Sequence, residues 1–376
     1  MAGIKFEKVA PEYYPERVGF RPKTHAFPMD VSFVLMNGGG GDYITWMQAI
    51  RWLASEATWI NGRVIVPKYF RELAQYWLKD YPKWKFADYT DAQNLPDINT
   101  TPFRGPVDLQ RESLNATGAH LSTCGWVYFT NKECAPDGID PWYERHGLPA
   151  AGWDYYPPFL QEDLDKIVLP LEARSLIPGS YAVITTGITT PSRETPPGAW
   201  NPIIDHVISR GLTPVFLGKS LVETGNSKNI HTQWNKGTNY HLGLDLKDKT
   251  TLMQAASIMS RAAVIIGHDN GLLHLAGCTR NPPIVFGYNL ASPKHREPKR
   301  PVGKVYNVCL TREELACNFC QSNTNFVIGY NFRACMYNDN KCMTMLFEQG
   351  AYRWKDAIDR ALKESTDHCT NASGLK

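Results

Sequence analysis

Short apolar runs alternate with amphipathic segments along two separate stretches of this 376-residue chain. In the first stretch, runs at 31–36, 64–66 and 84–86 predict strands, and the segments between them repeat apolar residues every three or four positions. The second stretch repeats this order from Tyr181 to Gly287. Alternating strands and helices are typical of parallel sheets covered by helices. The sequence therefore predicts an α/β fold with two facing Rossmann-like domains.

The periodicity also sets the expected boundaries. In the first stretch, one helix should bury Ile44, Met47, Ile50, Leu53, Ala54 and Ala57, and another Phe70, Leu73, Ala74, Trp77 and Leu78. The second stretch should contain strands at 181–186, 214–218, 263–267 and 284–287, helices at 200–209 and 250–262, and a short helix from Gly271. We expect a proline-rich extension at 1–29, domains at 30–175 and 176–350, and a last helix within 351–376 that packs back across the domains. Residues 90–160 match no pattern.

Composition narrows the class of protein. Hydrophobic residues make up 43% of the chain and charged residues 20%, so both domains can bury a core. The net charge of +3 is too small to indicate a nucleic-acid partner by itself. A basic loop at 294–304, with Lys294, His295, Arg296, Lys299, Arg300 and Lys304, could meet phosphates, although a solvated loop is the alternative. No export signal and no apolar run of about 20 residues is present, which favours the cytoplasm, with peripheral membrane contact still open.

A glycine run follows the first predicted strand. Gly38, Gly39, Gly40 and Gly41 let a ligand approach the backbone, and Asp42 stands where the next helix begins. The run lacks the third glycine of a dinucleotide-binding loop and the Gly-Lys-Ser/Thr of a phosphate-binding loop. Asp42 could cap the helix, or it could be a carboxylate at the mouth of a cleft that takes a proton from a hydroxyl.

A second polar motif, Gly267-His268-Asp269-Asn270-Gly271-Leu272-Leu273-His274, follows a predicted strand of the second domain. A helix start beside His274 could hold a diphosphate, and Asp269 could position sugar or ribose hydroxyls. The alternative is structural, with the Asp as a cap and the His as a satisfied neighbour. The pairing of this motif with the glycine run, one in each domain, favours a shared binding cleft.

Two segments resemble the heptosyltransferases, glycosyltransferase family 9. GGGGDYITWMQAIRWL resembles the Gly-Asp opening of that family, and residues 245–298 resemble its donor site with the D-[ST]-G-x-x-H core. The resemblance implies a GT-B architecture, a nucleoside-diphosphate sugar as co-substrate, an inverting displacement and no catalytic divalent metal. It further implies that Asp42 is the catalytic base. The donor-binding residues it implies are Gly40, Gly41, Arg193, Lys219, Asp269, Asn270, Gly271 and His274.

The sequence does not identify the acceptor. The family majority favours a bacterial surface saccharide, the cysteines favour a protein Ser/Thr, and the basic loop favours a hydroxymethylated DNA base in a phage-infected host. A protein of another class, one that binds nucleotide sugars without catalysis, remains an alternative. The Asp163-x-Asp165 pair resembles the metal-binding pair of other transferases, but it lies on a polar helical face and is predicted to be surface.

Four cysteines form the last motif. Cys317 and Cys320 are two residues apart, and Cys335 and Cys342 follow within a short Asn-rich stretch. This spacing favours a tetrahedral thiolate site for structural zinc or iron, with disulfides or plain thiols as alternatives. Some protein-modifying relatives of the heptosyltransferases carry a comparable four-cysteine iron site, so the resemblance points the same way.

Overall fold

The computed structural model divides the chain into two compact units, residues 1–157 and 158–376. The residues that it describes are 29–34, part of a helix between 40 and 54, 60–88, 156–187, 191–219, 222–224, 227–230, 237–280, 282–290, 292–300 with gaps, 303–320 and 335–372 with gaps. Asp42, the proline-rich extension and most of 90–160 lie outside these residues. The boundary expected between 175 and 176 differs from the observed division, because 158–175 packs on the second unit.

The first unit contains a parallel three-stranded sheet. Its strands are β1 (Met29–Val34), β2 (Ile60–Val66) and β3 (Lys85–Asp88), in the order β1-β2-β3. The described residues between Gly40 and Ala54 are helical, and α2 (Lys68–Trp77) packs on β2 and β3. Both helices bury the expected apolar faces where they are described, with Ile44, Met47, Ile50, Ala54, Phe70, Leu73, Ala74 and Trp77 in the core.

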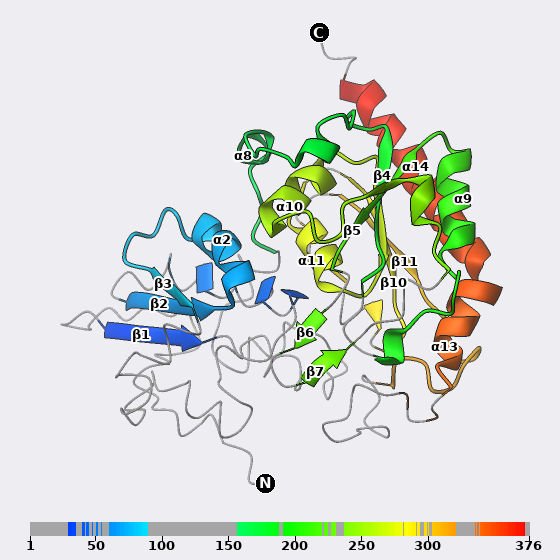
Figure 1. Ribbon diagram of the computed structural model, residues 1–376, viewed down its shortest axis with the longest axis horizontal. Helices are drawn as coiled ribbons and strands as arrows, with labels where there is room; N and C mark the ends of the chain where they lie inside the picture. The colour runs from blue at the N-terminus through cyan, green and yellow to red at the C-terminus, as the bar shows by residue number, and fades with distance from the viewer. Residues whose placement is uncertain are drawn as a thin grey trace. The chain divides into compact units, whose positions relative to one another are not determined.

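The second unit is built on a parallel six-stranded sheet (Figure 1). The order is β11-β10-β9-β4-β5-β8, with β4 (Tyr181–Thr185), β5 (Thr213–Leu217), β8 (Leu244–Asp245), β9 (Val264–His268), β10 (Ile284–Gly287) and β11 (Val305–Val308). A separate antiparallel pair is formed by β6 (Val222–Thr224) and β7 (Ser227–Ile230). Strands β4 and β9 are buried along their whole length, which explains why their sequences are apolar from Tyr181 to Ile184 and from Val264 to Gly267 rather than alternating.

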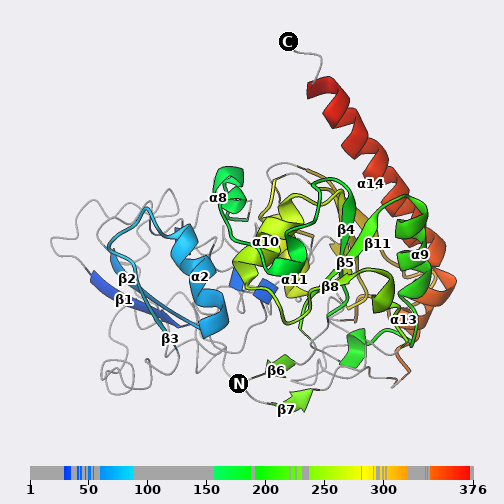
Figure 2. The same cartoon turned by 45° about the horizontal axis from the view of Figure 1, so that its top comes forward.

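Helices cover both faces of this sheet (Figures 1 and 2). On one face, α9 (Asn201–Ser209) contacts β5, and α14 (Ala351–Ala372) contacts β9, β10, β11 and α9. On the other face, α11 (Gly271–Gly277) contacts β9 and β10, and α10 (Leu252–Ser260) packs on α11 and on α8 (Gln161–Asp165). A doubly wound sheet of this kind directs its loops and ligands to the carboxyl ends of the strands.

The C-terminal helix belongs to the second unit. Trp354 of α14 is fully buried and lies in ring contact with Trp200 and Phe347. Gly287 on β10 has no room for a side chain, because a Cβ there would overlap the Trp354 indole. The contacts described for α14 are with β9, β10, β11, α9 and the π-helical turn of this unit, and its packing across the domains stays a prediction.

The segment that leads into α14 is a short helical run. It consists of α13 (Lys341–Thr344) and a π-helical turn, Met345–Gln349, which places Phe347 against His268 at a ring distance of 6.1 Å. The 3-10 turns of the unit are Leu171–Ala173, Pro191–Arg193 and Tyr240–Leu242. Among the described helices of the chain, none is long and apolar enough to cross a membrane.

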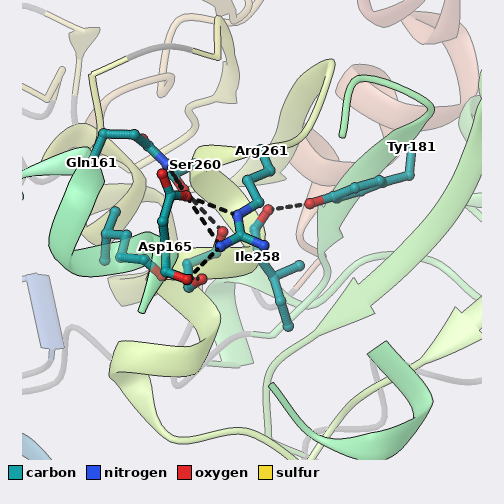
Figure 3. Close-up of polar contacts among 8 residues, drawn as sticks. Gln161, Asp165, Tyr181, Ile258, Ser260 and Arg261 are labelled. Atoms are coloured by element: carbon teal, nitrogen blue, oxygen red, sulfur yellow. Dashed lines mark hydrogen bonds and ion pairs between the residues drawn. The ribbon is translucent and has the colours of Figure 1, made fainter. Parts of the chain in front are cut away.

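Polar contacts join α8 and β4 of the second unit to the C-terminal end of α10 (Figure 3). The Asp165 carboxylate accepts from Gln161 at 3.0 Å and from the Arg261 guanidinium at 3.2 Å. The Tyr181 hydroxyl donates to the carbonyl of Ile258 at 2.6 Å, and its burial raises the pKa of the phenol. Asp165 is therefore a surface residue in an ion pair, and Asp163 pairs with Lys166. Both contacts agree with the surface position predicted for this pair.

Candidate functional site

The polar motif of the second unit lies at the carboxyl end of β9. Its register is fixed by a backbone bond, because the Asp269 amide donates to the carbonyl of Gly287 at the end of β10 at 2.9 Å. Gly267 brings β9 close to β4: a Cβ at this position would overlap the Thr185 hydroxyl and lie 2.8 Å from the Thr185 carbonyl oxygen. The glycine is thus required by close approach of two strands, directly below the polar residues.

Arg193 and Asp269 form a buried ion pair at this end of the sheet. Arg193 Nη2 lies 3.0 Å from Asp269 Oδ2, and Nη1 donates to the backbone carbonyl of Asp269 at 3.1 Å. Both side chains are buried. Arg193 ends the 3-10 turn that follows β4, so the pair joins the loop after one strand to the end of its neighbour. Charge-assisted bonds of this kind hold the guanidinium in one orientation.

His274 completes a three-residue network. Its Nε2 lies 3.4 Å from Asp269 Oδ1, and its ring packs edge-on against Phe286 at 5.6 Å. With an ionised carboxylate as acceptor, Nε2 carries the hydrogen. Asp269 therefore contacts Arg193 with one oxygen and His274 with the other. This arrangement places a guanidinium and an imidazole on either side of one carboxylate, which can orient both toward an anionic ligand.

Asn270 has a structural role in addition to the donor binding predicted for it, which stays a prediction. It is the N-cap of α11: its Oδ1 accepts from the amides of Leu272 at 2.9 Å and Leu273 at 3.2 Å. Its Nδ2 donates to the hydroxyl and the carbonyl of Thr185. The cap is thus Asn270 rather than Asp269, and two amides at the start of α11 are already satisfied within the chain. The helix begins at Gly271, as predicted.

His268 lies beneath the network and was not assigned a role from the sequence. It is fully buried, and the structure gives neither ring nitrogen a hydrogen-bond partner among the described residues. Burial, with the positive charge of Arg193 as the next cause, lowers the pKa of His268 to about 3, while Asp269 acts in the opposite direction. The imidazole is therefore neutral and packs as an apolar ring on Phe347.

Lys219, Gly40 and Gly41 are the other predicted donor-site residues that the structure describes. Lys219, after β5, is exposed and pairs with Asp248 at 3.8 Å. Gly40 and Gly41 are helical rather than in a loop, and Gly41 is buried in the first unit. Asp42 is outside the described residues. The network of Arg193, Asp269 and His274, with Asn270 and Gly271 beside it, is the part of the predicted site that the structure brings together.

The basic loop is described only in part. Of its cations, Arg300 is buried, and its guanidinium donates to the carbonyls of Thr279 and Pro282, each at 2.8 Å. Burial lowers the pKa of Arg300 to about 10. The expectation that this arginine could meet phosphates is therefore wrong, because its donors are used inside the chain. Lys304 is exposed, and Lys294, His295, Arg296 and Lys299 are outside the described residues.

Cys342 is close enough to the other three cysteines of the motif for their charges to affect its thiol. Burial raises the pKa of Cys342 to about 11, and Cys320, Cys335 and Cys317 each contribute to the increase. Burial and then Cys335 raise the pKa of Cys317. Phe319, inside the Cys317–Cys320 turn, has a left-handed backbone with φ of 59°. No disulfide joins the described cysteines, and in the part of the chain that is described no three His, Cys, Asp or Glu are grouped closely enough to hold a metal ion.

Comparison with known proteins agrees with the predicted resemblance. Residues 157–327 match the family described as glycosyltransferase family 9 (heptosyltransferase). No curated protein matches the sequence. Among solved structures, the iron-containing dodecameric glycosyltransferase TibC from enterotoxigenic E. coli H10407 is similar, with 16% identity, a TM-score of 0.58, and coverage of 91% of this chain and 78% of TibC.

A second solved structure shows the same relative with a ligand. It is the heptosyltransferase TibC in complex with ADP-D-beta-D-heptose, with 17% identity, a TM-score of 0.56, and coverage of 90% of this chain and 77% of that one. At this identity the likeness shows a shared fold. The family match covers residues 157–327, less than half of the chain, and agrees with an α/β fold of the glycosyltransferase type.

Proposed function

We propose that this chain is an inverting transferase that moves a sugar from a nucleoside-diphosphate donor to an acceptor hydroxyl. The match of residues 157–327 to glycosyltransferase family 9 (heptosyltransferase) supports this proposal. The observation that carries the proposal is the buried network of Arg193, Asp269 and His274 at the carboxyl end of β9. It lies where doubly wound sheets bind their ligands. The ADP-heptose complex of TibC favours an ADP-linked heptose as the first donor to test.

The chemistry follows from charge. The acceptor oxygen attacks the anomeric carbon while Asp42 takes the hydroxyl proton, and the bond from that carbon to the diphosphate breaks with its electron pair on the leaving group. Arg193 and His274 stabilise the growing negative charge, and Asp269 holds both side chains in place. Attack from the face opposite the diphosphate inverts the configuration. The protein's own cations perform this role in the proposal, so transfer should persist when divalent ions are chelated.

The acceptor that we propose is a bacterial surface saccharide, as in the family majority. A protein hydroxyl and a hydroxymethylated DNA base are the alternatives. These three are separated by incubating the protein with labelled donor and each acceptor class, and by mass spectrometry of the products. DNA as acceptor requires affinity that falls steeply as salt increases.

The direct test combines binding and transfer. A nucleoside diphosphate at 100 times its dissociation constant should add about 2.7 kcal/mol of stability, which a thermal-shift screen of ADP, GDP, UDP and dTDP detects. Asp42→Asn should lower the transfer rate by about 10²- to 10⁴-fold while donor affinity persists. Transfer within a few-fold of wild type would remove Asp42 from the role of base. Binding without transfer to any acceptor class would favour a catalytically inactive binding protein.

The cysteines fit a metal by their chemistry. The thiols of Cys317, Cys320 and Cys335 lie within electrostatic range of Cys342, and the left-handed turn at Phe319 bends the chain between the first two. TibC is described as iron-containing. We propose that Cys317, Cys320, Cys335 and Cys342 draw together around iron or zinc, which would supply structural cross-linking rather than chemistry. Elemental analysis of protein purified without chelators should give about one metal per chain. Cys342→Ser should lose it and Cys309→Ser should retain it.

A further inference from the structure

Asn289 contacts both the candidate donor site and the cysteine cluster, which is the set of Cys317, Cys320, Cys335 and Cys342. It lies two residues beyond β10, at the same end of the sheet as Asp269, and is buried. Its Nδ2 donates to the carbonyl of Ser192 at 3.0 Å and to Cys342 Sγ at 3.4 Å. Ser192 immediately precedes Arg193 in the 3-10 turn after β4.

The orientation of this amide is fixed by its partners. The Ser192 carbonyl can only accept, so the amide must present its nitrogen there. The same nitrogen has a second hydrogen, and Cys342 Sγ receives it. The backbone of Asn289 is also tied to the cluster, because the amide of Phe319, inside the Cys317–Cys320 turn, donates to its carbonyl at 2.8 Å.

We infer that Asn289 is a positioning residue, which holds the Ser192–Arg193 turn in place for the donor diphosphate and makes this placement depend on the cysteine cluster. The inference rests on the proposed function, since the diphosphate is the ligand that Arg193 would contact. If the Cys342 end of the link moves, the amide rotates and the Ser192 carbonyl loses its donor. A buried carbonyl without a partner is costly, so the turn that carries Arg193 shifts.

The same end of the chain offers a matched control. Asn318, between Cys317 and Phe319, is also a buried asparagine whose Nδ2 donates to a carbonyl, that of Leu310 at 2.6 Å. This bond reaches Leu310, two residues beyond β11, rather than the Ser192–Arg193 turn. Asn289→Leu and Asn318→Leu therefore remove the same type of bond close to the same cysteines, but only the first variant removes a bond to the donor side.

The experiment is calorimetric titration with the nucleoside diphosphate that the thermal-shift screen selects from ADP, GDP, UDP and dTDP. Asn289→Leu should weaken binding by about 10- to 100-fold, the equivalent of one lost buried hydrogen bond, and Asn318→Leu by less than about threefold. In an Arg193→Met background the Asn289→Leu effect should largely disappear, because a positioning residue acts through the residue that it positions. Equal effects of the two asparagine variants, or full additivity with Arg193→Met, would overturn the inference.

The link between Asn289 and the cysteine cluster can also be tested by a substitution at Cys342. Cys342→Ala keeps Asn289 and removes its sulfur partner, so it decides the matter even if Asn289→Leu does not fold. We expect weaker diphosphate binding for Cys342→Ala and none of this loss for Cys309→Ala, which changes a cysteine outside the cluster. Unchanged binding in Cys342→Ala refutes the link. If wild-type protein binds none of the four diphosphates, the proposed function fails; if wild type binds and all variants match it, only this inference fails.

Discussion

Arg193 contacts Asp269 twice, with Nη2 on the carboxylate at 3.0 Å and Nη1 on the backbone carbonyl at 3.1 Å. One contact is with the side chain of Asp269 and the other is with its main chain. The guanidinium therefore holds the backbone just after β9 in place and also compensates the charge of the carboxylate. Removal of either partner would take away the opposite charge from a buried ion. The pair is therefore expected to matter for folding and for ligand binding alike.

The first prediction concerns the stability of this pair. Arg193→Met keeps most of the side-chain volume and leaves Asp269 buried without its cation, which should cost about 3–5 kcal/mol of unfolding free energy. Urea denaturation measures this loss. Arg210→Met is the control, because Arg210 pairs with Asp359 at the surface, where an ion pair contributes about 1 kcal/mol or less. Similar losses in the two variants would show that burial of the Arg193 pair has no energetic consequence.

The second prediction concerns the imidazole of the network. His274→Gln keeps a polar side chain but removes the ring beside Asp269, and we expect kcat/KM for the donor to fall by about 10²-fold. Steady-state transfer assays check this value. His206→Gln should leave the donor kinetics unchanged, because His206 pairs with Asp359 at 2.9 Å on the α9–α14 side of the sheet. A wild-type rate in His274→Gln would exclude His274 from stabilisation of the leaving group.

The third prediction concerns pH. The pKa of His268 is lowered to about 3 in the folded chain, mainly by burial, from an ordinary value of 6.5. Between these values the unfolded state binds a proton that the folded state does not, so stability is lost as the pH falls from 6.5 toward 3. From pH 7 to pH 5 the contribution of His268 should amount to about 2 kcal/mol.

His268→Leu isolates this effect from the titration of the carboxylates. The free energy of unfolding is measured for wild type and variant at both pH values, and the difference between the two proteins should shift by about 2 kcal/mol in favour of His268→Leu at pH 5. A difference that is the same at pH 7 and pH 5 would mean that His268 takes a proton in the folded state as readily as in the unfolded state.

Most regular elements of the second unit could be predicted because their signals are local. Strand β9 is apolar from Val264 to Gly267 because both faces of the sheet are covered, and the start of α11 follows from Gly271 after a polar residue. Strand β8 has two residues and β11 has four, too few for a periodic signal. The strand order could not be predicted from the sequence alone, because pairing joins segments that are distant along the chain.

The candidate site, like the regular elements, could be predicted where its signals are local. Arg193, Asp269 and His274 follow strand ends, so their meeting at one edge of the sheet was foreseeable. Asn289 also follows a strand, and that position was its available signal. Its partners lie 97 and 53 residues away in the sequence, which no local pattern reveals. The pairing of Lys219 with Asp248, and the cap formed by Asn270, depend on loop geometry that the spacing of residues does not specify.

The last prediction concerns the close approach of β4 and β9 below the site. Gly267→Ala places a Cβ against the Thr185 hydroxyl and 2.8 Å from the Thr185 carbonyl oxygen, and backbone cannot yield as a flexible side chain can. We expect a loss of about 1–3 kcal/mol in unfolding free energy, the usual cost of forcing an extra carbon into a packed site. Gly187→Ala is the matched control, since a Cβ there meets no atom within 4 Å.

Because Thr185 also accepts from Asn270, separation of the strands should shift the cap of α11 and weaken diphosphate binding in Gly267→Ala alone. Equal stability and binding in the two alanine variants would show that the strands can separate without disturbing the polar residues above them.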